Sequence, residues 1–282
     1  MSDLDTPERH PWNVDFSWQP RQGPFRRLSA AQADHFDEFG FVIVNDAVDA
    51  TTLEHVTAEI DTFEAELESL LRAADGERAF IAEADAITFT THLVGRSQAA
   101  RKLATDDVFV DLCSDVIGPD VNMYWDQAVY KKNTKPRRFP WHQDNGYTFI
   151  EPQQYLTCWL ALTDATVENG CPWIAPGVHR CGTLIHTYVD PLGFECFAEP
   201  PTPAVPAPVR AGSALVFSSL TPHTTGPNLT DSVRKAYILQ YAPANARVLR
   251  GDPNVGPPSR SEPCDDPKRQ FPILRDGVRV ED

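Results

Sequence analysis

Hydrophobic and polar positions in the first 120 residues follow the period of α-helices. Ser29, with a glutamine three residues later, matches a capping box, and Gly40 stands where the helix that it opens would end. Four apolar residues then predict a short strand over 41–44. Further helices are expected near 97–104 and 106–117.

A longer helix is predicted between these segments. Thr51 and Glu54 repeat the capping-box pattern and mark its expected start. Its apolar face consists of Leu53, Val56, Ile60, Phe63, Leu67 and Leu70. Its other face is acidic, which is typical of a solvated helix surface, and carries Glu59, Asp61, Glu64, Glu66 and Glu68.

The pattern changes at Val121, where short β-rich runs begin to alternate with Gly, Pro, Asn and Asp. Such spacing favours an antiparallel sandwich or barrel behind the N-terminal helical layer, that is, a mainly β fold with flanking helices. The strands are expected at 121–131, 155–163, 172–175, 212–218, 220–224 and 234–242.

The 282 residues are consistent with one domain. An irregular, proline-rich arm begins the chain, and its aromatic residues indicate packing onto the body or onto a neighbouring subunit. The expected parts are the arm at 1–27, the helical layer at 28–120, the β core at 121–242 with a proline-rich insert at 182–208, and a wrapped tail at 243–282.

Composition excludes some classes of function. Hydrophobic residues make up 41% of the chain and no run is long enough to span a bilayer, so disorder and a membrane anchor are not expected. The net charge of −15 argues against a nucleic-acid or anionic-membrane partner. Six cysteines without a C-x-x-C pair, and an N-terminus without a leader, favour reduced thiols in the cytoplasm.

Candidate chemistry begins with His142 and Asp144. In an extended backbone, residues two apart point to the same side, so an imidazole and a carboxylate can converge. His223, in the apolar run 220–224, is a possible third ligand or a core histidine bonded to a carbonyl. Two histidines and one carboxylate form the facial triad of non-haem iron oxygenases.

Arg234 lies beyond a turn that follows His223. The two residues are nearly symmetric about the turn, so a hairpin would place the guanidinium beside the imidazole. An arginine there offers a planar, permanently charged fork for a carboxylate.

This set of residues resembles the phytanoyl-CoA dioxygenase family of Fe(II)- and 2-oxoglutarate-dependent oxygenases. The resemblance covers about 30–241 and includes the stretches Phe139-Pro140-Trp141-His142-Gln143-Asp144, Asn169-Gly170-Cys171-Pro172-Trp173-Ile174-Ala175-Pro176-Gly177-Val178-His179-Arg180 and Gly212-Ser213-Ala214-Leu215-Val216-Phe217.

The resemblance implies a double-stranded β-helix, or jelly roll, with Fe(II) held by His142, Asp144 and His223. It implies 2-oxoglutarate on the iron with its distal carboxylate at Arg234, and hydroxylation of a substrate C–H by O2 with release of succinate and CO2. It further implies that the cosubstrate pocket includes Thr225, Trp159, Thr157, Gln127 and Tyr124.

The segment 131–138 holds five basic residues just before the first ligand. It is either a solvated loop that balances the acidic surface or a site where Lys135 and Arg137 bind an anionic group of the substrate. The expected partner is a small molecule, and the chain is expected to be a monomer or a homodimer. Two alternatives remain: a non-catalytic jelly-roll binding protein, and a cupin-like metal enzyme that needs no cosubstrate.

Overall fold

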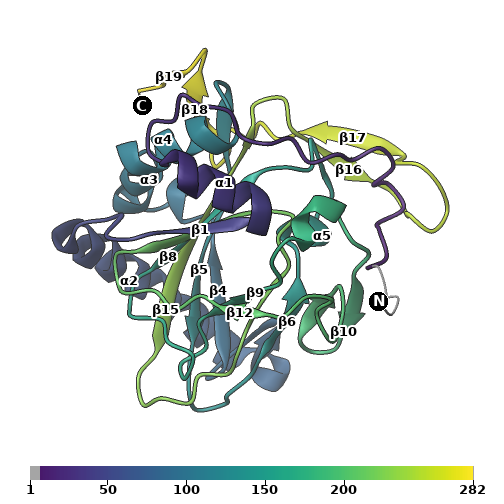
Figure 1. The fold of residues 1–282 in the computed structure, drawn as a ribbon. Coiled ribbons are helices and arrows are strands. Elements are labelled where there is room, and N and C mark those ends of the chain that lie inside the picture. The colour runs from purple at the N-terminus through teal and green to yellow at the C-terminus, as the bar shows by residue number, and fades with distance from the viewer. Residues whose placement is uncertain (1–6, 282) are drawn as a thin grey trace.

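The computed structural model describes residues 7–281, in which two antiparallel sheets form the core and helices cover the larger sheet (Figure 1). The larger sheet has the order β1-β13-β8-β15-β5-β4-β3-β2, with β18 attached to β5 and β19 attached to β18, and the smaller one has the order β12-β9-β14-β6. This is the jelly-roll class that the sequence predicts.

The elements have the following bounds. The helices are α1 (Ala30–Phe39), α2 (Ala50–Ala73), α3 (Gln98–Ala104), α4 (Asp107–Val116) and α5 (Asp144–Tyr147), with 3-10 turns η1 (Asp75–Glu77), η2 (Leu93–Gly95) and η3 (Val178–Cys181). The large sheet contains β1 (Phe41–Val44), β2 (Arg78–Ala79), β3 (Ala82–Glu83), β4 (Ile87–Thr91), β5 (Val121–Lys131), β8 (Leu156–Ala161), β13 (Ala214–Ser218), β15 (Arg234–Pro243), β18 (Pro272–Arg275) and β19 (Val278–Arg279). The small sheet contains β6 (Phe139–His142), β9 (Pro172–Ile174), β12 (Val205–Pro206) and β14 (His223–Thr225). The remaining strands are β7 (Ile150–Glu151), β16 (Arg247–Arg250) and β17 (Arg260–Pro263), which pair together, and the hairpin of β10 (Thr187–Val189) and β11 (Gly193–Glu195).

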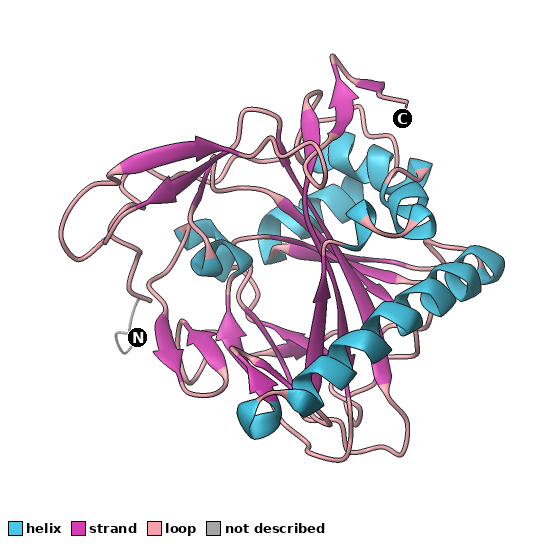
Figure 2. Ribbon diagram, turned by 180° about the vertical axis from the view of Figure 1, so that it is seen from behind, coloured by secondary structure: helices cyan, strands magenta, loops and turns pink. Residues whose placement is uncertain are grey.

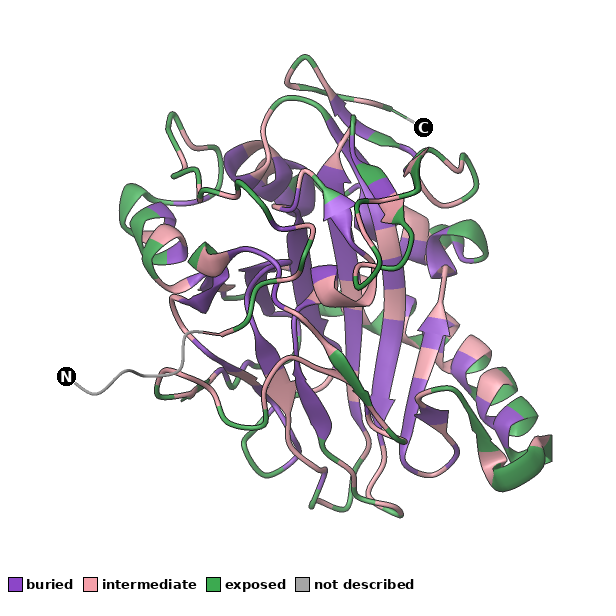
Figure 3. Ribbon diagram, turned by 90° about the vertical axis from the view of Figure 1, so that its right-hand side faces the viewer, coloured by how far each residue is buried: buried purple, intermediate pink, exposed green. Residues whose placement is uncertain are grey.

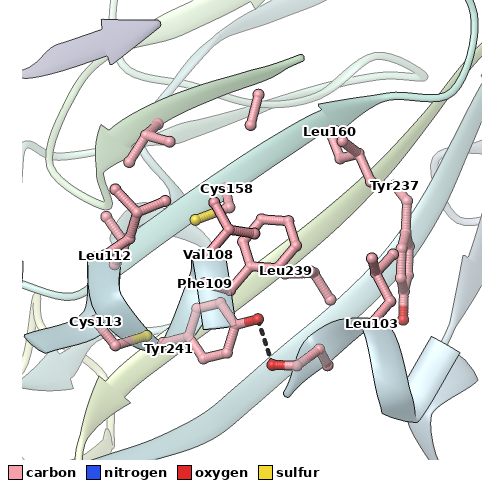
Figure 4. Packing of buried hydrophobic residues seen from close by; sticks show 14 of the residues in the cluster. Leu103, Val108, Phe109, Leu112, Cys113, Cys158, Leu160, Tyr237, Leu239 and Tyr241 are labelled. Atoms are coloured by element: carbon pink, nitrogen blue, oxygen red, sulfur yellow. Dashed lines mark hydrogen bonds between the residues drawn. The ribbon is translucent and has the colours of Figure 1, made fainter. Parts of the chain in front are cut away.

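Successive side chains of the large sheet point to opposite faces, one against the helices and the other toward a cavity. On β15, Tyr237, Leu239 and Tyr241 pack beneath the helices, as Figure 4 shows for their cluster with α3 and α4. The Tyr241 hydroxyl there donates to the Ala104 carbonyl at 2.8 Å. The residues of opposite parity, such as Ile238 and Gln240, line a cavity between the two sheets.

The structure confirms both predicted ends of α1. Both hydrogen bonds of the Ser29 capping box are present, and Gly40 ends the helix at φ 87°. A side chain at this angle would be strained, and a Cβ here would also lie 2.5 Å from the His179 ring, so glycine is required on both grounds.

The predicted start of α2 is wrong by two residues. Asp49 caps the helix, and its carboxylate accepts from the amides of Thr51 and Thr52 at 3.0 Å each. An aspartate two residues before the threonine pair supplies a charged acceptor, which binds amides more strongly than a hydroxyl does.

The acidic face of α2 is only partly solvated, contrary to expectation. Glu64 and Glu68 are buried and bind Lys132 at 2.8 and 2.7 Å, while the apolar-face residue Leu70 is 69% exposed. Figure 3 shows the resulting division of α2 into an exposed outer side and a buried inner side. The helix lies across the strands of the large sheet (Figure 2), and the loop after β5 neutralises its inner carboxylates.

The two ends of the chain also take part in the fold. The arm packs on the body, where the Trp12 indole donates to the Gly256 carbonyl at 2.8 Å and Trp18 lies edge-on to His179. The C-terminal segment contains strands where the sequence predicts a wrapped tail, and one of them, β18, pairs with β5 and extends the large sheet. Within residues 7–281, no helix combines the length and the apolarity that a membrane span requires.

Candidate active site

The two histidines of the predicted cluster lie on adjacent strands. β6 and β14 pair antiparallel with His142 opposite His223, and the ring centroids are 4.1 Å apart. Each Nδ1 faces a backbone carbonyl, that of Pro140 at 2.9 Å and that of Thr221 at 3.0 Å. Since a carbonyl only accepts, each Nδ1 must carry the proton, which leaves both Nε2 lone pairs available to a metal.

Asp144, the first residue of α5, is the third member of the cluster. Gln143 between the ligands is extended (φ −105°, ψ 144°), so the carboxylate turns to the same side as the imidazole. Its Oδ1 lies 3.8 Å from the Nε2 of His142 and 3.8 Å from that of His223. Its Oδ2 accepts a 2.6 Å hydrogen bond from the Thr157 hydroxyl, which fixes the orientation of the carboxylate.

This donor set fits iron. One ligand atom from each of the three residues lies within 4.8 Å of the other two. Burial and the neighbouring His223 hold the pKa of His142 well below its usual range, which keeps that imidazole neutral, as metal binding requires. Two imidazoles and one carboxylate leave coordination positions for other molecules.

Arg234 also lines this cavity, and it is a buried cation with no counterion among the described residues. Its side chain is 1% exposed, and none of its three guanidinium nitrogens meets a hydrogen-bond partner within residues 7–281. The guanidinium stands 5.1 Å from the centroid of Trp159. Burial lowers the pKa of Arg234 to about 10, so the charge is retained at neutral pH. Such a group requires an anionic ligand, because an unpaired buried charge is strongly unfavourable.

The predicted hairpin between His223 and Arg234 is not present. β14 pairs with β6 and β9 in the small sheet, whereas β15 pairs with β5 and β8 in the large one. The chain crosses between sheets after His223, as jelly-roll connections do. The two residues come together because both line the cavity between the sheets.

Lys131 is a second buried cation and was not singled out by the sequence. It is the cross-strand partner of Arg234 and is 1% exposed. Its ammonium donates to the carbonyls of Arg137 at 3.0 Å, of Thr225 at 3.1 Å and of Gly226. Burial and the nearby Arg234 lower its pKa. We therefore regard Lys131 as the residue that positions the strand end bearing Thr225.

The other expected cosubstrate residues line the cavity, which has a volume of about 570 Å³. They are Thr225, Trp159, Thr157, Gln127 and Tyr124. Lys135 and Arg137 do not line it: Lys135 binds Glu77 at 2.8 Å and Arg137 binds Glu83 at 3.0 Å. The proposed substrate role of these two cations gains no support from this placement.

Gln143 is a structural residue that sequence reasoning missed. Its buried amide donates to the carbonyls of Gly182 and Leu220 at 3.0 and 2.6 Å, and its oxygen accepts from the amide of Leu184 at 2.6 Å. These bonds fix the segment between the two ligands. The available signal was a polar residue between two ligands in an extended segment, because its side chain points away from the metal into the protein.

Comparison with known proteins places these features in a family. The model of the phytanoyl-CoA dioxygenase family matches residues 36–236, a span that contains all three residues of the cluster and Arg234. The methylphosphonate hydroxylase of Gimesia maris is 30% identical over 162 residues, which cover 54% of this chain and 57% of that protein. The phytanoyl-CoA dioxygenase domain-containing protein 1 of Bos taurus is 25% identical, over 80% of this chain and 94% of that protein.

A solved structure agrees with the fold. SnoK, a non-haem α-ketoglutarate-dependent carbocyclase from nogalamycin biosynthesis, superposes with a TM-score of 0.70 at 21% identity, covering 89% of this chain and 100% of that one. The chain thus spans under two thirds of the length of the methylphosphonate hydroxylase, but the family match extends over most of its own length. On that match, the chain belongs to the phytanoyl-CoA dioxygenase family, whose members are iron- and 2-oxoglutarate-dependent oxygenases.

Proposed function

We propose that the protein is an Fe(II)- and 2-oxoglutarate-dependent dioxygenase that hydroxylates a C–H bond of a small organic molecule and releases succinate and CO2. The observation that carries the proposal is the presence, in one cavity, of the His142–Asp144–His223 cluster and the unpaired guanidinium of Arg234. The first fits a metal with open positions, and the second fits the distal carboxylate of the cosubstrate.

The residues of the cavity would have separate roles in binding the metal, the cosubstrate and the substrate. The Nε2 atoms of His142 and His223 and one oxygen of Asp144 would hold the iron, which supplies the oxygen-activating redox chemistry when bound. Thr157 would hold Asp144 through the oxygen that does not face the histidines. Arg234 would orient 2-oxoglutarate, with Thr225 beside it, and the aromatic walls of the cavity would exclude water.

The proposal has further parts. We propose that residues 1–282 form one dioxygenase domain, that the protein acts as a monomer or homodimer in the cytoplasm, and that it has no nucleic-acid or membrane partner. The acidic net charge of −15 and the sparse cysteine pattern support these parts.

Succinate release from 2-oxoglutarate tests the activity. The purified protein with Fe(II), ascorbate and O2 is compared with His142→Ala across a broad panel of small molecules. We expect release above the variant's level. Absence of such release, together with failure of the oxygen-free protein to develop a metal-to-ligand charge-transfer band with Fe(II) and 2-oxoglutarate, would refute the proposal in favour of a non-catalytic binding protein. A metal-dependent product formed without 2-oxoglutarate would favour the cupin-like alternative.

A further inference from the structure

The charge of the cavity wall restricts the substrate. Among the described residues that line the cavity, the side chains with a full charge are those of Asp144 and Arg234. The proposed function assigns both of them, the first to the metal and the second to the cosubstrate. The wall left for a substrate is therefore neutral.

Much of that wall is apolar. Aromatic and aliphatic side chains come from the large sheet, from the small sheet and from the β10–β11 hairpin, and they include Phe89, Phe139, Phe194, Phe217 and Ile238. Phe139 packs against Phe89 at 5.6 Å and edge-on against His142 at 4.7 Å, so the apolar wall reaches the cluster. A charged substrate group would lose its hydration here without gaining a partner.

The cations of the basic loop 131–138 are already paired. Lys132 binds Glu64 and Glu68, Lys135 binds Glu77, Arg137 binds Glu83, and Arg138 binds Glu195 at 2.8 Å. Lys131 is enclosed by three carbonyls. Each basic residue of the loop 131–138 therefore has a protein partner, and none is available to a phosphonate, a carboxylate or a coenzyme A phosphate.

Neutral polar side chains also line the cavity. Tyr155 and Gln240 are not among the expected cosubstrate residues, and Tyr155 contacts Tyr124 edge-on at 5.4 Å. Burial raises the pKa of both tyrosines, so they stay as neutral hydroxyls. These groups can bond to a hydroxyl or a carbonyl without a counterion.

The mouth is apolar as well. Phe80, at the turn between β2 and β3, lines the cavity, yet it is 60% exposed. It stacks on Tyr188 of β10 at 5.9 Å and 15°, and Tyr188 contacts Phe194 edge-on at 5.5 Å. The two segments over the mouth thus meet through aromatic rings, and exposed rings at an entrance favour an apolar ligand.

We infer that the substrate is an uncharged, mostly apolar aromatic or alicyclic molecule that carries hydroxyl or carbonyl groups. This inference rests on the proposed function for the place of the metal and the cosubstrate. It assigns the cavity to a different chemical class from the anion named in the methylphosphonate hydroxylase relative.

Matched ligands of equal skeleton and different charge test the inference. The protein is loaded with Mn(II) and 2-oxoglutarate without oxygen, and 2-naphthol, 2-naphthoic acid and 2-naphthyl phosphate are titrated by calorimetry, followed by a monoterpene alcohol and a steroid alcohol. We expect at least one neutral ligand to bind, and 2-naphthol to bind at least tenfold more tightly than either anion. Tighter or equal binding of an anion, or no binding of any neutral ligand, overturns the inference.

A pair of exposed residues provides the variant control. Phe80→Ser should weaken the binding of the neutral ligand by about tenfold, because it removes one ring of the mouth. Val255→Ser, at a residue that is 83% exposed and outside the cavity lining, should leave binding unchanged. Calorimetry of 2-oxoglutarate with the Mn(II) protein is run first. Failure there counts against the proposed function, whereas normal cosubstrate binding with preference for anions counts against this inference alone.

Discussion

At the scale of single residues, the site depends on charged side chains that have few hydrogen-bond partners within the protein. Arg234 is buried without a partner among the residues that the structure describes, and the Thr157 hydroxyl holds Asp144. The residue types were readable from the sequence, because His142, Asp144, His223 and Arg234 follow a recognisable spacing. The supporting role of Lys131 was not readable, because its three carbonyl partners come from segments 6 to 95 positions away.

Replacing Arg234 should shift stability and ligand binding in opposite directions. In Arg234→Met the unpaired charge is removed, so the ligand-free protein should gain about 1–4 kcal/mol in the free energy of unfolding. The stabilisation that 2-oxoglutarate and Mn(II) give to the native protein should largely disappear in the variant. Urea unfolding with and without cosubstrate measures both effects. The exposed Arg210→Met serves as control, and a loss of stability in ligand-free Arg234→Met would contradict the interpretation.

Thr157→Val should weaken metal binding about 10- to 100-fold, which is the usual effect of removing a partner that orients a metal ligand. The two side chains have similar shapes, so the fold should persist. Titration with Co(II) followed by its visible absorption gives the affinity. Thr187→Val, at an exposed position of β10, is the matched control, and equal affinities for the two variants would exclude the orienting role.

Asp126 should make stability depend on pH. Its buried carboxyl accepts from the Tyr237 hydroxyl at 2.8 Å and from the Val94 amide at 3.2 Å, and burial raises its pKa from 3.8 to about 6. The folded protein thus holds this proton more tightly than the unfolded chain does, so stability falls as pH rises through 4 to 6.

The isosteric Asp126→Asn cannot titrate and isolates this effect. We expect the stability of the native protein relative to the variant to decrease by up to about 3 kcal/mol between pH 4 and pH 7. Urea unfolding at several pH values gives the difference. A constant difference across this range would show that the folded-state pKa is not raised.

At the scale of elements, periodicity predicted the main helices and several core strands. It missed others, such as β4, which lies within the expected helical layer, and β6, which carries His142. It also could not predict which strands pair. The strand 121–131 was placed at its observed bounds, because its β-rich run is bounded by clear turn residues. The predicted hairpin between His223 and Arg234 was wrong, because local symmetry about a turn carries no information on which sheet each strand joins. The prediction that the acidic face of α2 is solvated was wrong for a similar reason, because the counterion Lys132 lies 64 positions beyond Glu68 in the sequence.

The start of α2 offers a direct test of the corrected cap. Asp49→Ala should lower the Tm by roughly 2–4 °C, because two helix-end amides lose their acceptor. Thr51→Ala should change the Tm much less, since the side chain of Asp49 receives the amide of Thr51 in either case. Calorimetry of the two variants decides between the caps, and a larger effect at Thr51 would restore the original prediction.

At the scale of the whole molecule, hydrogen bonds connect the N-terminal arm to the segment that carries Asp144. The buried Asn13 amide donates to the carbonyls of Cys181 and Thr183 at 2.9 Å each, and the Thr183 hydroxyl accepts from Asn145 at 2.6 Å. Asn145 directly follows Asp144. The sequence predicted that the arm packs, from its aromatic residues, but could not show where.

Asn13→Ala should therefore cost about 2 kcal/mol in the free energy of unfolding, because the Cys181 carbonyl loses this donor and the Thr183 carbonyl is left with the amide of His10. Urea unfolding measures the loss, and Val14→Ala, at a neighbour that is 72% exposed, should be nearly neutral. Equal stability of both variants would mean that the arm rests on the body without supporting it.

The alternation along β15 also bears on how such a protein could acquire new substrates. Ile238 and Gln240 face the cavity, while their neighbours Tyr237, Leu239 and Tyr241 face the helices. A mutation at one of the first two alters what the cavity accepts and leaves the packed layer intact. Selection can therefore diversify the chemistry of this chain one position at a time, with little penalty in folding, and directed evolution can use the same positions.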